Sequence, residues 1–136
     1  MALIDDLKKK YPQSLAWAFG DSPEMADELS DLVCRGLKTA SCGSLSAFRE
    51  DPDAPRPGSI NIILNGQDVP VCVIRTISTR LLHFSEATEA LAIKEGEGDL
   101  SLEYWRQEHK AFFTREGTYS DDMEIVAEEF EVVEVV

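Results

Sequence analysis

The chain has 136 residues, of which 26 are acidic and 13 are basic, so its formal net charge at neutral pH is −13. A chain of this length builds one hydrophobic core, and a hydrophobic content of 43% is typical of a globular protein. Because affinity for long nucleic acids comes from Lys and Arg that displace counterions, this charge argues against duplex binding. We therefore expect a single domain over residues 1–136, with no long duplex nucleic acid as its partner.

Neither the apolar runs nor the cysteines indicate a membrane or an oxidising compartment. No apolar run approaches the roughly 20 residues that cross a bilayer, and the N-terminal segment MALIDDLKKKYPQ lacks the apolar middle of a secretory signal. Cys34, Cys42 and Cys72 are odd in number and have no metal-ligand spacing, which is typical of a reducing compartment. We expect a cytoplasmic protein with no membrane partner.

The first half of the chain contains one strongly marked helix. Residues 3–10 predict a short helix that ends at the proline of KYPQ. The stretch GDSPEMADELSDLVCRG then predicts a longer helix, with Asp21 or Ser22 as its N-cap, a proline in the first turn, apolar residues at helical spacing and Gly36 as its stop. Next, KTASC predicts a buried strand or an extended loop, and SLSAFRE predicts one or two helical turns.

The second half alternates strands and helices. The proline-rich residues 51–59 predict a surface loop, and residues 60–82 predict two strands joined at Asn65-Gly66, a pair that tolerates positive φ in hairpin turns. SEATEALAIKEGEG predicts a helix capped by Ser85, and DLSLEYWRQEHKAFFTREG predicts a helix capped by Asp99. The β-branched C-terminal segment IVAEEFEVVEVV predicts a closing strand, with the acids of EEFEVVE on its solvent face.

Strands that are separated by helices, and antiparallel where the hairpin can be identified, predict an α+β domain. The sheet is expected to be curled or to form a partial β-barrel, with the helices packed around it. From residues 35 to 80, six basic residues outnumber four acidic ones. This local balance suggests a neutral or basic site inside an acidic envelope.

Several common catalytic centres lack their signatures. Only His83 and His109 are available as imidazole ligands, and neither has a metal-ligand spacing. His109 falls on an apolar helical stripe with Trp105 and Phe113, which favours a buried or half-buried histidine over a ligand or a base. The chain has no GxSxG nucleophile elbow and no GxxxxGK[ST] phosphate loop. We predict no metal and no cofactor.

The stretch GLKTASCGS places Lys38 beside two hydroxyl residues, Thr39 and Ser41. A buried lysine with a lowered pKa activates a neighbouring hydroxyl, whereas the C-terminal end of a helix favours the charged ammonium. The sequence leaves open which influence prevails. An exposed lysine that ends a helix is the simpler alternative.

A second unusual stretch, KEGEGDLS, alternates the acids Glu95 and Glu97 with Gly96 and Gly98. Glycines between carboxylates cost conformational entropy. Two interpretations remain open: a flexible connection between helices, or a carboxylate that is held near a reacting group.

Taken together, five stretches resemble the ASCH domains of the PUA-like superfamily, in particular a bacterial single-domain branch. These stretches are FGDSPEMADEL, GLKTASCGSL, PGSINIILNGQDVPVCVIRT, EGEGDLSLEYWRQEHKAFF and FEVVEV. The resemblance implies a barrel-like curled sheet, a cleft bordered by the GxKT turn, and an association with RNA or nucleotides. Some members of the wider family remove the acetyl group from N4-acetylcytidine with a lysine, a threonine and a glutamate. Another bacterial member has been associated with ribonuclease activity.

Carried over by position, the resemblance assigns the lysine to Lys38, the threonine to Ser41, which keeps a hydroxyl, and the glutamate to Glu97 or, if the alignment slips, Glu95. The first functional hypothesis is therefore an N4-acetylcytidine amidohydrolase. In it, neutral Lys38 takes a proton from Ser41 or water, and Glu97 passes a proton to the leaving amine.

Two alternatives remain. A ribonuclease acting on single-stranded RNA would use Lys38 and Arg75 to stabilise a phosphorane, and a non-catalytic module would bind RNA or a nucleotide. In all three hypotheses the partner is a modified nucleoside or a short single strand. The candidate substrate-binding residues are Thr39, Arg75, Glu95, Trp17 and Arg106, with Trp17 placed to stack on a base and Arg106 free to meet a phosphate.

Overall fold

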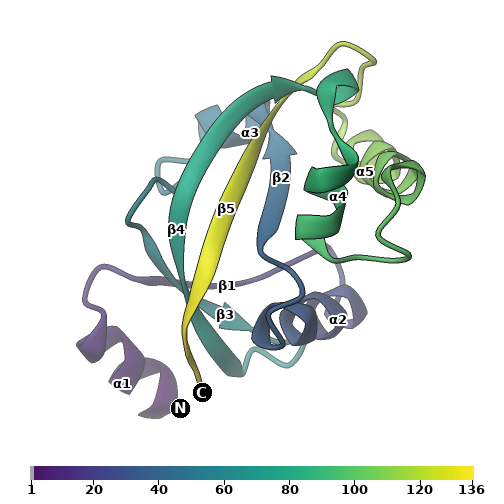
Figure 1. Ribbon diagram of the computed structural model, residues 1–136. Coiled ribbons are helices and arrows are strands. Elements are labelled where there is room, and N and C mark those ends of the chain that lie inside the picture. The colour runs from purple at the N-terminus through teal and green to yellow at the C-terminus, as the bar shows by residue number, and fades with distance from the viewer. Residues whose placement is uncertain (1) are drawn as a thin grey trace.

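A computed structural model describes residues 2–136 as an α+β fold, in which helices flank a strongly curved sheet (Figure 1). The elements follow in the order α1 (Ala2–Lys10), β1 (Leu15–Ala18), α2 (Pro23–Cys34), β2 (Ala40–Ser44), α3 (Leu45–Glu50), β3 (Ile60–Leu64), β4 (Pro70–His83), a 3₁₀ turn (Phe84–Glu86), α4 (Glu89–Glu95), α5 (Leu102–Glu116) and β5 (Glu124–Val135). In this part of the chain, no helix combines the length and the apolar composition that crossing a membrane requires.

The sheet has the strand order β1-β3-β4-β5-β2 and curls into an open half-barrel. Only β1 and β3 pair in parallel, and the other neighbours are antiparallel. The long β4–β5 ladder shifts register twice, and such irregularities bend and twist a sheet. The two edge strands, β1 and β2, do not pair with each other. The predicted α+β class with a curled sheet is confirmed.

The helix predicted within GDSPEMADELSDLVCRG forms as α2 for the expected reasons. The hydroxyl of Ser22 accepts a hydrogen bond from the Met25 amide, Pro23 occupies the first turn, and Gly36 follows the helix end with φ +75°. Leu29 and Val33 are buried against the sheet. This helix leads directly into the turn that carries Lys38.

Two predicted helix caps are wrong. The N-cap of α4 is Thr88, because Ser85 lies within the preceding 3₁₀ turn. The N-cap of α5 is Ser101, and Asp99 instead accepts a hydrogen bond from the Ser101 amide at 2.9 Å. Asp99 therefore shapes the turn before the helix rather than capping the helix itself.

The predicted hairpin exists, but its turn differs from the two-residue form. The side chain of Asn65 accepts hydrogen bonds from the amides of Gln67 and Val69, and the residue with positive φ is Asp68. Gly66 is needed for a close approach instead, since a Cβ there would lie 2.2 Å from the Pro23 carbonyl oxygen. The sequence also failed to reveal β1, a four-residue strand whose burial does not alternate.

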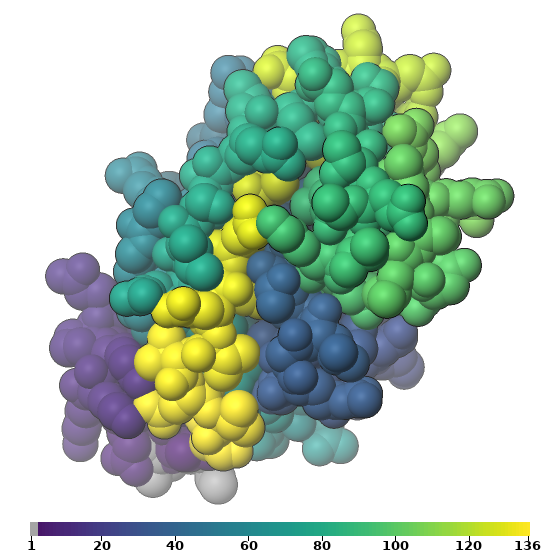
Figure 2. Space-filling model, in the orientation of Figure 1, coloured from purple at the N-terminus to yellow at the C-terminus, as the bar shows by residue number. Residues whose placement is uncertain are grey.

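The buried residues form three hydrophobic clusters. The first lies between the sheet and α4–α5 and includes Leu91, Trp105, Phe113 and Ile125. The second lies under α2 and includes Phe19, Val33, Ile63, Ile74 and Phe130, and a smaller third cluster lies under α1. Figure 2 shows the face on which the C-terminal part of β5, in yellow, is exposed between α1 and α2.

The expectation of an entirely solvated acidic face on the last strand is wrong in one place. Glu128 is only 7% exposed, and its Oε2 accepts a hydrogen bond of 2.6 Å from the Thr76 hydroxyl. Burial along β5 is continuous from Ile125 to Glu128 and alternates only in the second half of the strand, so this carboxylate lies inside the half-barrel.

Candidate functional site

Lys38 lies at the point where the chain leaves α2 and enters β2, and its side chain is buried. The amides of Leu37 and Lys38 both donate to the Leu32 carbonyl, and the Thr39 amide donates to the Lys94 carbonyl. These bonds fix the turn between α2 and the end of α4. Lys38 is only 2% exposed, and a buried ammonium requires hydrogen-bonding partners of opposite charge. The alternative of an exposed lysine is wrong.

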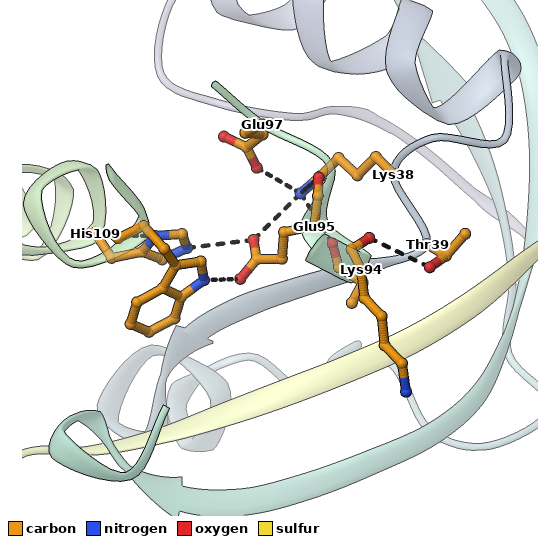
Figure 3. Close-up of polar contacts among 8 residues, drawn as sticks. Lys38, Thr39, Lys94, Glu95, Glu97 and His109 are labelled. Carbon is orange, nitrogen blue, oxygen red and sulfur yellow. Dashed lines mark hydrogen bonds and ion pairs between the residues drawn. The ribbon is translucent and has the colours of Figure 1, made fainter. Parts of the chain in front are cut away.

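Four oxygen atoms surround the Lys38 ammonium group. Its Nζ donates to Glu97 Oε2 at 2.7 Å, to the Ala40 carbonyl at 2.9 Å and to Glu95 Oε1 at 3.3 Å, with the Glu95 carbonyl at 3.5 Å (Figure 3). Burial alone would lower the pKa of Lys38, but the charges of Glu95 and Glu97 outweigh it and raise this pKa above its usual value. The group is a charged ammonium whose three protons are all engaged.

Both acids of KEGEGDLS reach Lys38 because the chain bends between them. Helix α4 ends at Glu95, and Gly96 caps it in the left-handed conformation with φ +71°. A Cβ on Gly96 would lie 2.1 Å from the Leu37 carbonyl oxygen, so only glycine fits between the helix end and the lysine turn. The glycine therefore brings one carboxylate to each side of the ammonium.

Glu95 also connects Lys38 to two aromatic residues of α5. Its Oε2 accepts a hydrogen bond from the Trp105 indole nitrogen, and its Oε1 lies 3.3 Å from His109 Nε2. His109 Nδ1 lies 2.9 Å from the Trp105 carbonyl oxygen, which can only accept, so Nδ1 carries a proton. Because Nε2 faces a carboxylate, it also carries a proton, and His109 is an imidazolium.

The pKa values of this pair agree with the geometry. Burial alone would raise the pKa of Glu95, but the charges of His109 and Lys38 lower it to about 2. Burial alone would lower the pKa of His109, but the charge of Glu95 raises it above its usual value. The imidazole ring also stacks on the Trp105 ring, with centroids 4.1 Å apart. His109 is a buried histidine, as expected from its stripe, but it also belongs to the charged cluster.

The charged cluster forms one end of a cavity of about 410 Å³. The cavity is lined by Phe19, Gly20, Asp21, Met25, Glu28, Leu29, Lys38, Ser41, Cys42, Glu95, Glu97, Tyr104, Glu108, His109, Phe112 and Arg115. Its aromatic and aliphatic walls come from α2, the segment before it, and α5. Glu97 is 20% exposed, so its carboxylate is the member of the cluster that is open to a ligand, whereas Glu95 is 2% exposed.

The lining of this cavity is acidic, whereas the sequence suggested a neutral or basic site. Five carboxylates line it against one lysine, one arginine and one histidine. The Arg115 side chain pairs with Asp21 at 2.9 Å, and of the six basic residues between positions 35 and 80 only Lys38 lines the cavity. The other five, which come from the end of α2, α3, the loop after α3 and β4, do not line it.

Ser41 lines the same cavity, as the sequence analysis expected of a hydroxyl near Lys38. It is half-buried, and among residues 2–136 its hydroxyl has no hydrogen-bond partner. Thr39, in contrast, donates its hydroxyl proton to the Lys94 carbonyl at 3.2 Å and lies away from the charged cluster (Figure 3). Of the two hydroxyl residues, the structure brings only Ser41 to the cavity.

Besides Thr39, three more of the predicted substrate-binding residues lie outside this cavity. Arg75 pairs with Glu131 at 2.6 Å on the exposed surface of the sheet. Arg106 lies near the Ser85 carbonyl, at 3.4 Å, beside a separate hollow. Trp17 lines a second cavity. In the part of the chain described, no cluster of three or more His, Cys, Asp or Glu residues has a metal-binding arrangement.

Phe112 and Arg115 line the cavity but were not predicted from the sequence as part of a site. Both belong to α5 and reach the cavity because this helix faces α2 across it. His109 could have been suspected because it stands four residues after Trp105, on the face of the helix that follows the acidic stretch. No sequence signal distinguished Phe112 and Arg115 from core or surface residues.

Comparison with known proteins places these residues in a family. The family model of the ASCH domain matches residues 15–134. The crystal structure of an ASCH domain from Lactobacillus crispatus JV V101 is similar to this chain, with 32% identity and a TM-score of 0.84 over 94% of this chain and 84% of that chain. Protein EF3133 from Enterococcus faecalis V583 is 34% identical, with a TM-score of 0.83 over 99% of this chain and 92% of that chain.

A more distant structure shares the fold alone. Hypothetical protein PH0355 is 18% identical and has a TM-score of 0.56 over 88% of this chain and 97% of that chain. A search of curated proteins found no match.

Proposed function

Because the chain belongs to the ASCH domain family, we propose that it is a hydrolase of modified nucleosides and that it removes the acetyl group from N4-acetylcytidine. The observation that carries this proposal is the ion pair between Lys38 and Glu97 at one end of an acidic cavity that also contains Ser41. The resemblance to N4-acetylcytidine amidohydrolases rests on the same three positions.

The size and the lining of the cavity suit an uncharged nucleoside. Its volume of about 410 Å³ lies within the usual range for small-molecule sites, roughly 300–1,000 Å³. Phe19, Phe112 and Tyr104 offer aromatic surfaces against which a base can pack. Because carboxylates outnumber bases in the lining, a phosphate backbone would be repelled, which favours a nucleoside over the ribonuclease hypothesis.

The protonation state of Lys38 requires a different mechanism from the one in which neutral lysine acts as the base. Lys38 is an ammonium with a raised pKa, and all its protons are hydrogen-bonded. Glu97, which is ionised in the pair with Lys38 and partly exposed, is the better base. Lys38 then acts as the cation that holds Glu97 in place and stabilises negative charge.

In this mechanism the Glu97 carboxylate accepts a proton from the attacking oxygen, which belongs to Ser41 or to a water molecule beside it. The oxygen bonds to the acetyl carbonyl carbon, and the carbonyl oxygen becomes an oxyanion. Once Glu97 is neutral, its hold on the Lys38 ammonium weakens, and an ammonium proton becomes available to the oxyanion. The C–N bond then breaks, and Glu97 returns the proton to the amine of cytidine.

The two possible nucleophiles lead to different products on the protein. If Ser41 attacks, an acetyl ester forms on its hydroxyl, and water then releases acetate. If water attacks, acetate forms directly. Rapid quenching followed by mass spectrometry of the protein separates these routes.

The test of the proposed function is to incubate the protein with N4-acetylcytidine and, separately, with a short single-stranded RNA. The proposal expects cytidine and acetate from the first substrate and no cleavage of the second. Nucleoside turnover should change little between low and high salt, because no phosphate is bound. RNA fragments that disappear with increasing salt would favour the ribonuclease hypothesis, and binding without any product would favour a non-catalytic module.

A further inference from the structure

A second cavity lies where the half-barrel fails to close, between the edge strands β1 and β2. It has a volume of about 580 Å³. Its lining comes from α1, β1, β2, α3, the loop after α3, β3 and β5. It includes Lys8, Trp17, Ser41, Cys42, Gly43, Phe48, Asp51, Asp53, Asn61, Val126 and Glu128. Ser41 and Cys42 also line the Lys38 cavity, so the two cavities adjoin along β2.

The floor of this second cavity is polar, although it belongs to the inside of the half-barrel. Asn61 on β3, Thr76 on β4 and Glu128 on β5 are 6%, 1% and 7% exposed. Asn61 lies two residues from Ile63, and Glu128 lies two residues from Phe130, so both share the face of these core residues. Three adjacent strands thus place buried polar side chains where a closed barrel would have aliphatic ones.

The Asn61 amide and the Glu128 carboxylate each have only one of their two polar atoms in a hydrogen bond. Glu128 Oε2 accepts from Thr76 at 2.6 Å, and Asn61 Oδ1 accepts from the Trp17 indole nitrogen at 2.9 Å. Within residues 2–136, Glu128 Oε1 and Asn61 Nδ2 have no hydrogen-bond partner, yet no buried side-chain nitrogen or oxygen is left unsatisfied. These two atoms are therefore not fully buried, and because Asn61 and Glu128 line the cavity, they are available to it as a donor and an acceptor.

Two aromatic side chains border the same space. Trp17 is half-buried, and its hydrogen bond to Asn61 fixes the orientation of its ring. Phe48 on α3 is also half-buried but belongs to none of the three hydrophobic clusters. Aromatic surfaces beside an acceptor and a donor are the components that bind a flat heterocycle.

We propose that the opening between β1 and β2 is a second ligand-binding site for a flat, uncharged heteroaromatic ring that carries an amino group next to a ring nitrogen, as in adenine or cytosine. The amino group donates to Glu128 Oε1, and the ring nitrogen accepts from Asn61 Nδ2. Asp51, Asp53 and Glu128 outnumber Lys8 in the lining, which disfavours a phosphate. Binding at this second site is independent of whether the Lys38 cavity hydrolyses a nucleoside.

The test compares adenosine with purine riboside, which lacks only the amino group. Binding is followed by tryptophan fluorescence, since Trp17 is one of two tryptophans and the other, Trp105, is 3% exposed. We expect adenosine to bind about tenfold more tightly, because purine riboside leaves the buried carboxylate without a donor. Equal affinity for the two nucleosides, or no binding of adenosine at millimolar concentration, would overturn the proposal.

Four variants locate the site. Glu128→Gln keeps an acceptor for Thr76 but presents an amide to the cavity, so the preference for adenosine should disappear. Glu131→Gln, the same change at an exposed position of the same strand, should have no effect. Phe48→Ala should weaken adenosine binding severalfold, whereas Phe112→Ala in the Lys38 cavity should not.

Each variant must be folded for its binding to be compared. Circular dichroism and thermal melts establish that each variant is folded. If Glu128→Gln does not fold, the pair Phe48→Ala and Phe112→Ala decides, because neither side chain is fully buried. Loss of adenosine binding in Phe112→Ala alone would assign the ligand to the Lys38 cavity and remove the second site.

Discussion

Lys38 and Glu95 are 57 positions apart in the chain and pair at 3.3 Å in the interior, where each is only 2% exposed. The pair belongs to a row of alternating charge that runs from His109 through Glu95 and Lys38 to Glu97. Two cations face two anions, so the row is neutral as a whole. Only the Glu97 end of the row is substantially open to the cavity. Glu97 is therefore the proposed base, and the other three residues hold it in place.

Removal of the central cation should destabilise the fold. In Lys38→Met, Glu97 loses its cationic partner and Glu95 keeps only His109 as a counter-charge. Breaking a buried pair costs about 3–5 kcal/mol. Urea denaturation measures this free energy. The control is Lys94→Met, since Lys94 pairs with Glu129 at 2.9 Å on the surface and such pairs contribute about 0–1 kcal/mol. Equal losses in the two variants would show that Lys38 is not held by buried charges.

A side chain at Gly96 should disrupt the site more than one at Gly36. Both glycines have positive φ, so alanine at either position costs about 1–2 kcal/mol of backbone strain. At Gly36 a Cβ meets no atom within 4 Å, whereas at Gly96 it meets the Leu37 carbonyl oxygen at 2.1 Å. We therefore expect Gly96→Ala to lose several kcal/mol more than Gly36→Ala in the same denaturation measurement, and to lose activity as well. Similar losses would contradict the close packing of the Gly96 turn against Leu37.

The free energy of unfolding should be highest between about pH 4.5 and 6.5 and should fall at both lower and higher pH. The pKa of Glu95 is lowered from 4.5 to about 2, so its contribution is complete above pH 4.5 and is lost as the pH falls towards 2. The pKa of His109 is raised above 6.5, so its contribution is complete below pH 6.5 and is lost as the pH rises through the raised pKa. Urea midpoints measured from acid to alkaline pH should therefore fall at both ends.

The alkaline part of this dependence should belong to His109. His109→Gln should be less stable than the unmodified protein, but its stability should change little as the pH rises above 6.5. His83→Gln is the matched control, because His83 is exposed and pairs only with Glu86. If both variants keep the same alkaline slope as the unmodified protein, His109 is not an imidazolium in the folded state.

The two carboxylates around Lys38 should be separable into a structural and a reacting group. Glu95→Gln should cost about 3–5 kcal/mol of stability, because it leaves two buried cations with one anion fewer. Glu97→Gln should cost less, since Glu97 is 20% exposed, but it should slow turnover by roughly 10²–10⁴-fold through loss of the base. Denaturation and steady-state kinetics on both variants check this division. The reverse pattern would make Glu95 the reacting carboxylate.

The sequence predicted most elements because local signals specified them. The capped helix α2, the long β4 and the closing strand β5 carry periodicity, caps and β-branched residues that do not depend on distant contacts. The caps of α4 and α5 were misplaced because two candidate residues stood close together in each case. Strand β1 was not predicted because its four residues are held by parallel pairing to β3, a contact that spans more than forty positions.

The sequence identified part of the candidate site but not its charge. Lys38 and Ser41 were singled out from the GLKTASCGS stretch and Glu97 or Glu95 from the resemblance, and the structure brings all four to one cavity. The protonation of Lys38 could not be predicted, because it depends on Glu95 and Glu97 meeting it across the fold. The acidic lining was missed for a related reason: Asp21, Glu28 and Glu108 come from elements whose approach to the cavity is set by tertiary packing.

The most direct test of the proposed function is the rate of cytidine release from N4-acetylcytidine, compared between the unmodified protein and Glu97→Gln at equal folded concentration. The account predicts rapid release by the unmodified protein and a loss of at least about 100-fold in the variant. Ser41→Ala, measured alongside, should be slow if Ser41 supplies the attacking oxygen and should keep most of the rate if water does. Thr39→Ala should retain most of the rate in either case. Absence of release by the unmodified protein, or an undiminished rate in Glu97→Gln, would contradict the account.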